Sequence, residues 1–127
     1  MLHGSINHVS LTVADLPAAL AFFDPLLRFL GYTPEHAEPT SVQVFLSCAT
    51  DRAVNIWQAS PNLRDHLFED YAPGLRHLAF NVQARDNIDT LGERIPEWGG
   101  VILNPPADYI FSADDRIAVI AEERPHV

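Results

Sequence analysis

The chain repeats itself at an offset of 69 residues, and this duplication limits the folds open to it more than any other feature. The offset superposes His8 on His77 and Gly31 on Gly100, and the apolar residues that alternate after each histidine superpose as well. An internal repeat indicates two copies of one supersecondary unit that bury their apolar faces together. We therefore expect a single domain over residues 1–127, with module one at 1–58, a linker at 59–74 and module two at 75–127.

Each copy opens with a segment in which apolar and less apolar residues alternate. "INHVSLTV" and "LRHLAFNV" have the two-residue period of a half-buried strand, with His8 and His77 on the less apolar face. Further strands are expected at 32–38, 42–48 and 53–58 in module one, and at 101–104 and 116–123 in module two. With one helix in each copy, this order predicts an α+β fold of two βαβββ-type modules, the second lacking its last strand.

The helix of module one carries clear signals at both ends. Asp15 is suited to the N-cap, Pro17 to the first turn and Gly31 to the C-terminal stop. Pro25 lies inside the apolar stripe, so we expect a kink or a break near Asp24. In module two a weaker helical pattern covers 86–98 and ends at two glycines.

The charge balance excludes some classes of partner. Eight Lys and Arg against 17 Asp and Glu give a formal net charge of -9, which repels a phosphate backbone or an anionic membrane surface. We therefore expect no nucleic-acid partner and, with no long apolar run, no membrane partner. Cys48 is the only cysteine and no signal peptide is recognisable, which together predict a cytoplasmic protein with Cys48 buried as a small apolar residue.

The repeated strand and helix resemble those of the vicinal oxygen chelate superfamily, which includes glyoxalase I, extradiol dioxygenases and bleomycin-resistance proteins. The resemblance is carried by "INHVSLTVADLPAALAFFDPLLRFLGY" and "PGLRHLAFNVQARDNIDTL...GGVILNPPADY" and extends over about residues 5 to 122. It implies that the modules form a curved mixed sheet around a cavity. It also implies metal ligands on cavity-facing strand positions: a histidine, a carboxylate, a second histidine and a glutamate.

His8 and His77 match the two histidines of that pattern by position and by parity. The carboxylate of the fourth strand is replaced by Asn55, a far poorer ligand, and Gln58 has the wrong parity to substitute for it. For the last glutamate two alignments remain. If residues 116–123 are the seventh strand of the family, the eighth is missing; if they are the eighth, Glu122 becomes a metal ligand.

The missing-strand alignment leaves a sheet edge without a partner, which favours pairing with another chain. A homodimer is the resulting expectation. Around the cavity, the resemblance makes Asn55 a candidate substrate-binding residue and suggests that Tyr109 lies in a loop that closes over it. Trp57 shares the strand face of Asn55, where it either stacks on a ligand or serves as a core aromatic residue.

Two functions follow from the resemblance. The first is a glyoxalase-like, metal-dependent enzyme of lyase, isomerase or dioxygenase type, in which one divalent Fe, Mn, Ni or Zn ion binds a small oxygen-chelating substrate. The alternative is a metal-free protein of the bleomycin-resistance type that binds a small molecule or antibiotic, for which the acidic surface favours a cationic ligand. A third reading, a degenerate chain that acts only in assembly, follows from the shortened second module.

Overall fold

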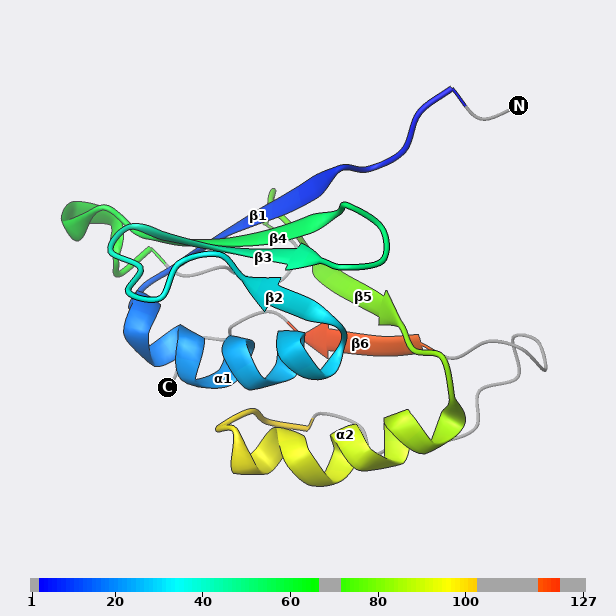
Figure 1. The fold of residues 1–127 in the computed structure, drawn as a ribbon. Helices are drawn as coiled ribbons and strands as arrows, with labels where there is room; N and C mark the ends of the chain where they lie inside the picture. The colour runs from blue at the N-terminus through cyan, green and yellow to red at the C-terminus, as the bar shows by residue number, and fades with distance from the viewer. Residues whose placement is uncertain (1–2, 67–71, 103–116, 122–127) are drawn as a thin grey trace. The chain divides into compact units, whose positions relative to one another are not determined.

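A computed structural model describes residues 3–66, 72–102 and 117–121 (Figure 1). The chain forms two compact units, Met1–Asp65 and His66–Val127, whose boundary falls inside the stretch expected as a linker. Both units contain strands and an α-helix, which confirms the predicted α+β class.

Unit 1 contains the complete β-α-β-β-β order expected of module one. Its elements are β1 (His8–Val13), α1 (Leu16–Phe29), β2 (Tyr32–Pro34), β3 (Val42–Ser47) and β4 (Ala53–Gln58), followed by the short 3-10 helix η1 (Pro61–Leu63). The strands form one mixed sheet in the order β1-β4-β3-β2, in which only the β1–β4 pair is parallel. This pairing brings the first and last strands of the module together.

The two faces of this sheet differ sharply in burial. Helix α1 lies along one face of the sheet (Figure 1). This face contributes Val13, Phe45, Val54 and Ile56 to a core that Leu16, Leu26 and Leu27 complete from the helix. Phe45 and Ile56 are fully buried. The opposite face holds the alternate strand positions, including His8, as the two-residue period predicts.

Helix α1 begins as the sequence predicts. The Asp15 carboxylate accepts a hydrogen bond of 3.0 Å from the backbone N–H of Ala18, and Gly31 after the helix adopts a φ of 95°, a left-handed conformation that favours glycine. The expected break at Pro25 does not occur. Pro25 removes one backbone donor, yet the buried Leu26 and Leu27 of the same turn hold the helix against the sheet, so α1 continues as one helix to Phe29.

Strand β2 is shorter than the predicted 32–38 and ends at Pro34. The buried side chain of Gln43 explains this difference, because its amide accepts from the backbone N–H of His36 at 3.0 Å and donates to the carbonyl of His36 at 2.7 Å. The peptide groups of His36 are thus satisfied by a side chain instead of a neighbouring strand. Cys48, expected to be buried, follows the end of β3, is exposed and contacts the Thr33 hydroxyl at 3.3 Å.

Unit 2 contains β5 (His77–Asn81), α2 (Arg85–Glu97) and β6 (Ile117–Ala121). Strands β5 and β6 pair antiparallel, with His77 opposite Ala121 and Asn81 opposite Ile117. Val101 and Ile102 are not in a strand, contrary to the expectation for 101–104, and Val101 is strongly exposed. Nothing pairs with them among the residues described, which removes the ladder that would hold them extended.

The direction of β6 bears on the two alignments of the C-terminal segment. In unit 1 the last strand, β4, runs parallel to the first, whereas β3 runs antiparallel to β4 and hence to β1. Strand β6 is antiparallel to β5, so it has the direction of a third strand of its module. The direction of β6 thus matches the third strand of unit 1, whereas its pairing with β5 matches the place of the last strand, β4, beside β1. Both alignments of the C-terminal segment therefore stay open.

Candidate functional site

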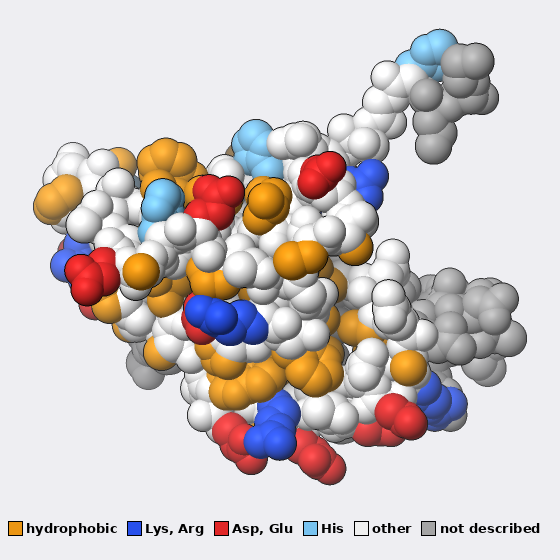
Figure 2. All heavy atoms as spheres, viewed as in Figure 1, with side chains coloured by type: hydrophobic (Ala, Val, Ile, Leu, Met, Phe, Trp, Pro, Cys, Tyr) orange, Lys and Arg blue, Asp and Glu red, His pale blue; other side chains and the backbone are white. Residues whose placement is uncertain are grey.

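The face of the unit 1 sheet opposite α1 carries the site residues that the sequence singled out in module one. Cross-strand register arranges them in three rows, and we call these rows the open face. The rows are His8–Ala53–Leu46–Thr33, then Ser10–Asn55–Val44, then Thr12–Trp57–Val42. None of these positions holds a carboxylate, a lysine or an arginine. Figure 2 shows hydrophobic side chains and a histidine along the upper edge of the molecule, over β1, β3 and β4.

His8 begins β1 and is exposed. Its ring nitrogen Nδ1 lies 2.9 Å from the side-chain oxygen Oδ1 of Asn7. An amide oxygen only accepts hydrogen bonds, so the neutral imidazole carries its proton on Nδ1 and has a free lone pair on Nε2. Two hydrogen bonds to the start of β4 hold the chain before His8: the backbone N–H of Ala53 donates to Asn7 and the Arg52 side chain donates to Ile6.

Asn55 occupies the middle row, between Ser10 of β1 and Val44 of β3. Its Nδ2 donates to the Ser10 hydroxyl over 3.4 Å, a long hydrogen bond. Its Oδ1 is buried from solvent and has no hydrogen-bond partner. An unpartnered buried acceptor costs about 1–3 kcal/mol, so this atom lies where a donor group from another molecule would be stabilising.

Trp57 lies on the same face in the next row, between Thr12 and Val42. The sequence left two roles open for it, and the structure favours a surface role because Trp57 is 43% exposed, whereas its strand neighbour Ile56 is fully buried on the other face. A large indole exposed beside small and apolar residues offers a flat surface for stacking.

Gln58 points to the α1 side of the sheet, as its parity predicted. Its oxygen Oε1 accepts from the backbone N–H of Leu16 at 2.7 Å, and its Nε2 donates to the carbonyl of Ala14 at 2.8 Å. Gln58 therefore joins the end of β4 to the start of α1 and is not a ligand of the open face. The sequence predicted which face of the strand carries Gln58, but it did not predict the hydrogen bonds that Gln58 makes to the start of α1.

His77 is the first residue of β5 and is exposed, on the strand face that Ala79 and Asn81 share. That it faces one cavity together with His8 stays a prediction. The β5–β6 register pairs Leu78 and Phe80, on the other face of β5, with Ile120 and Ala118. Tyr109 and Glu122 lie outside the described residues.

The donors on the open face fit poorly with the metal site that the resemblance implied. His8 offers an imidazole nitrogen and Asn55 a neutral amide oxygen, but the carboxylate that would balance a divalent charge is missing from this face. Within 3–66, 72–102 and 117–121, no three His, Cys, Asp or Glu side chains lie close enough together to hold a metal ion.

Asn7 is a site residue that the sequence did not predict, although its place beside His8 was a usable signal.

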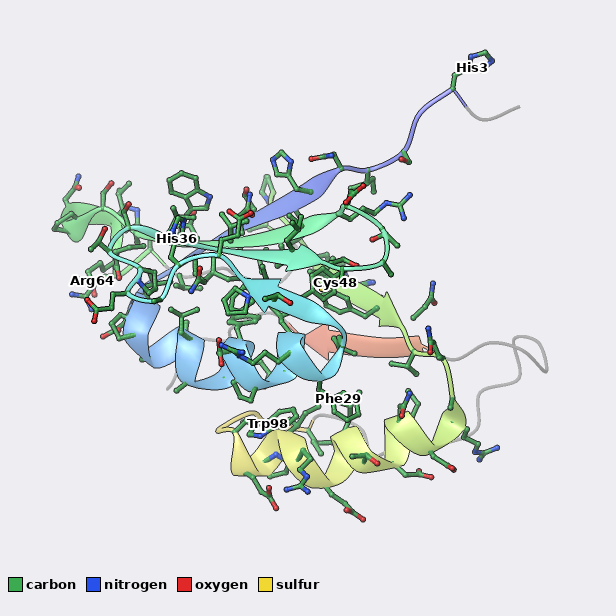
Figure 3. The ribbon with its side chains drawn as sticks, viewed as in Figure 1. His3, Phe29, His36, Cys48, Arg64 and Trp98 are labelled. Atoms are coloured by element: carbon green, nitrogen blue, oxygen red, sulfur yellow. The ribbon has the colours of Figure 1, made fainter. Side chains whose placement is uncertain are left out.

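A separate hollow of about 450 Å³ lies on unit 1, between α1 and the loop after β2. Leu20, Asp24 and Arg28 line it from the helix, and Glu35 and His36 line it from the loop, where Figure 3 labels His36. Asp24 and Arg28 form an ion pair of 2.8 Å across one turn of α1. Gln43, whose side chain lies on the α1 side of the sheet, also lines this hollow. The hollow is therefore distinct from the open face.

Membrane insertion finds no support in the helices: neither α1 nor α2, the described α-helices, combines the length and the apolar character that crossing a bilayer requires.

Comparisons with known proteins agree with the fold. The family model of the Glyoxalase/Bleomycin resistance protein/Dioxygenase superfamily matches residues 5–118. The uncharacterized protein YqjT of Bacillus subtilis (strain 168) is 26% identical over 119 residues, which cover 93% of this chain and 90% of YqjT. These matches span both repeats.

Solved structures show the same likeness. A glyoxalase candidate from Bacillus halodurans superposes with a TM-score of 0.70 and 28% identity, over 80% of this chain and 74% of that one. A variant of the fosfomycin resistance protein FosX from Listeria monocytogenes, complexed with Mn(II) and 1S,2S-dihydroxypropylphosphonic acid, has a TM-score of 0.58 and 18% identity, over 95% of this chain and 90% of that one. The resemblance inferred from the repeated strands is thus confirmed, and the chain belongs to the glyoxalase/bleomycin resistance protein/dioxygenase superfamily.

Proposed function

We propose that this chain binds a small organic molecule on the open face of unit 1 without a resident metal, in the manner of the bleomycin-resistance branch of its superfamily. One observation carries the proposal: the open face combines a half-exposed Trp57 with the hydrogen-bonding groups of His8 and Asn55, and holds no charged carboxylate. Such a surface has the apolar area and the few polar groups of a small-molecule site.

Binding in this site rests on Trp57 as the apolar anchor. A ligand that covers the indole removes apolar surface from water, and a cationic ligand gains in addition from the negative face of the ring. The net charge of -9 attracts cations to the protein over long range. A planar or partly planar cation is therefore the favoured class of ligand.

The donor set separates this proposal from a metal-dependent lyase, isomerase or dioxygenase. A hard divalent ion needs anionic oxygen ligands, and the position of the carboxylate in the family pattern is held by Asn55. Mn(II) belongs to the FosX complex, whose likeness to this chain is one of fold. Fe, Mn, Ni or Zn binding by this chain is the competing outcome in the test below.

The test is a fragment screen followed by NMR in the presence of a chelator. Fragments that bind should shift the backbone amide signals of β1, β3 and β4, with the largest changes near Asn55 and Trp57. Trp57→Ala should weaken these fragments by about tenfold or more, which corresponds to the loss of one stacked aromatic contact. Leu63→Ala is the matched control, because Leu63 is 46% exposed in the same unit but lies on η1.

Two results would contradict the proposal. The first is an open face whose signals no fragment shifts. The second is binding that appears only after Fe(II), Mn(II), Ni(II) or Zn(II) is added, together with calorimetric uptake of about one ion per chain that His8→Ala abolishes. That second result would establish the metal-dependent enzyme in place of the metal-free binder.

The homodimer and the cytoplasmic location stay predictions from the sequence. Sedimentation equilibrium over a range of protein concentrations distinguishes a dimer from a 14.1 kDa monomer.

A further inference from the structure

We propose that Asn7 is a positioning residue that makes the open face an acceptor surface, so that its ligand is an organic molecule presenting N–H donors. The inference rests on the proposed function and names the chemical class of its ligand. It joins two observations made at separate residues: the hydrogen bond between Asn7 and His8, and the unpartnered oxygen of Asn55.

The first step concerns the proton of His8. The Asn7 oxygen is 2.9 Å from Nδ1 and accepts the proton there, which leaves Nε2 of a neutral ring as an acceptor. The backbone of Asn7 is held in place because its carbonyl accepts a hydrogen bond of 3.1 Å from the N–H of Ala53. Its side chain therefore selects one of the two neutral forms of the imidazole, as partners of ligand histidines commonly do.

The second step concerns Asn55. Its Nδ2 is directed to the Ser10 hydroxyl, and this leaves Oδ1 as the group without a partner. The open face thus contains two acceptors of neutral charge, an exposed one on His8 and a buried one on Asn55, on neighbouring strands and two residues apart in register. With regular strand spacing their Cα atoms are about 8 Å apart, a separation that one small organic molecule bridges.

The third step is the polarity of the ligand. An acceptor-only molecule, such as a carboxylate or a phosphonate, would face two acceptors and find neither a lysine nor an arginine in the three rows of the open face. A molecule with two N–H groups, such as an amidinium, a guanidinium or a primary amine, pairs with both and can stack beside Trp57. This preference is local and adds to the long-range effect of the net charge.

The experiment compares three probes that share one ring: benzamidine, which donates from a cation, benzamide, which donates without charge, and benzoate, which only accepts. Binding is measured by NMR titration at high salt, where the attraction to the net charge is screened. We expect benzamidine to bind about tenfold or more tighter than benzoate, with benzamide between them. Benzoate binding as tightly as benzamidine would overturn the inference.

The role of Asn7 has its own spectroscopic readout. In the nitrogen NMR spectrum of the His8 ring, the proton of the neutral imidazole should lie on Nδ1. Asn7→Ala should shift the population toward the Nε2–H form and weaken benzamidine by about fivefold. Asn7→Asp, which keeps an acceptor oxygen, should restore the Nδ1–H form. Because Asn7 is exposed, neither substitution disturbs the core.

The outcomes separate this inference from the proposed function. The role of Asn7 is refuted, and the binding function retained, if fragments bind at the open face and one of two further results is found. The first is an Nε2–H form of His8 in the unaltered protein, and the second is an unchanged benzamidine affinity in Asn7→Ala. If none of the three probes binds while other fragments bind the open face, only the claim that the ligand presents N–H donors is refuted. An open face that binds no fragment at all refutes the binding function itself, whatever the form of His8.

Discussion

Replacing Asn55 by valine should stabilise the protein while abolishing ligand binding. Asn55 lies in the middle of β4, where valine suits the strand and leaves no polar atom unpaired. The change removes Oδ1, the buried oxygen that has no partner, and also the long hydrogen bond from Nδ2 to Ser10. The expected sign is unusual, because most substitutions in a strand are destabilising.

The magnitude follows from these two contributions. An unpartnered buried acceptor costs about 1–3 kcal/mol, and its removal recovers most of that penalty. The hydrogen bond to Ser10, at 3.4 Å, exceeds the usual range and contributes at most about 0.5 kcal/mol. The net gain is about 1–2 kcal/mol, or a rise in Tm of roughly 5 °C for a chain of this length.

The assay is thermal and urea unfolding of the unaltered protein, Asn55→Val and Asn55→Asp. Asn55→Asp is the matched control of nearly equal shape. It puts a carboxylate charge at a position without a hydrogen-bond donor, so the free energy of unfolding should fall by at least about 2 kcal/mol at pH 7. The fall should be smaller near pH 4, where the carboxyl protonates. A destabilised Asn55→Val would refute the reasoning, since it would mean that Oδ1 has a stabilising partner in solution.

Other substitutions test the fold and the polarity of the site. Asp15→Ala should lower the free energy of unfolding by about 1 kcal/mol through loss of the cap of α1, while Asp15→Asn should stay within a few tenths in urea unfolding. Gln58→Met should cost about 2 kcal/mol in the same assay because two hydrogen bonds between β4 and the start of α1 are lost, and a change below about 0.5 kcal/mol would contradict this role. Burial raises the pKa of Tyr32, and the charge of Arg52 opposes this with a smaller effect, so the folded state favours the neutral phenol. The free energy of unfolding should therefore fall as the pH rises above about 10. Tyr32→Phe should remove this part of the fall in urea unfolding measured up to about pH 11. Asn55→Glu restores the carboxylate of the family pattern and should raise Mn(II) or Zn(II) affinity by about tenfold in calorimetry, an effect that His8→Ala should cancel.

The proposed ligand class fits a chain in which Asn55 stands where the family pattern has its first carboxylate, while His8 stands where the pattern has its first histidine. A histidine that ligates a metal and a histidine that accepts a hydrogen bond from a ligand both need a bare Nε2 and a partner on Nδ1. Asn7 supplies that partner. The same geometry can therefore serve a metal-free site once the neighbouring ligand has become an amide.

The sequence alone determined the features that depend on local periodicity and on the chemistry of single caps. The alternation after His8 placed β1 and its two faces correctly, Asp15 and Gly31 marked the ends of α1, and the parity of Gln58 separated it from the open face. The internal repeat led to the superfamily, because duplicated strands with matching histidines leave few folds possible.

Only the tertiary structure decided which polar groups find partners, since those partners come from strands distant in sequence. The continuity of α1 through Pro25 and the early end of β2 at Pro34 depend on packing against the sheet and on the amide of Gln43. The same holds for Asn55, whose Oδ1 has no partner because the register sets it between Ser10 and Val44, neither of which donates to it. Residue type and parity put Asn55 on the open face, but its unpaired oxygen, on which the proposed binding chemistry rests, follows from the pairing of three strands.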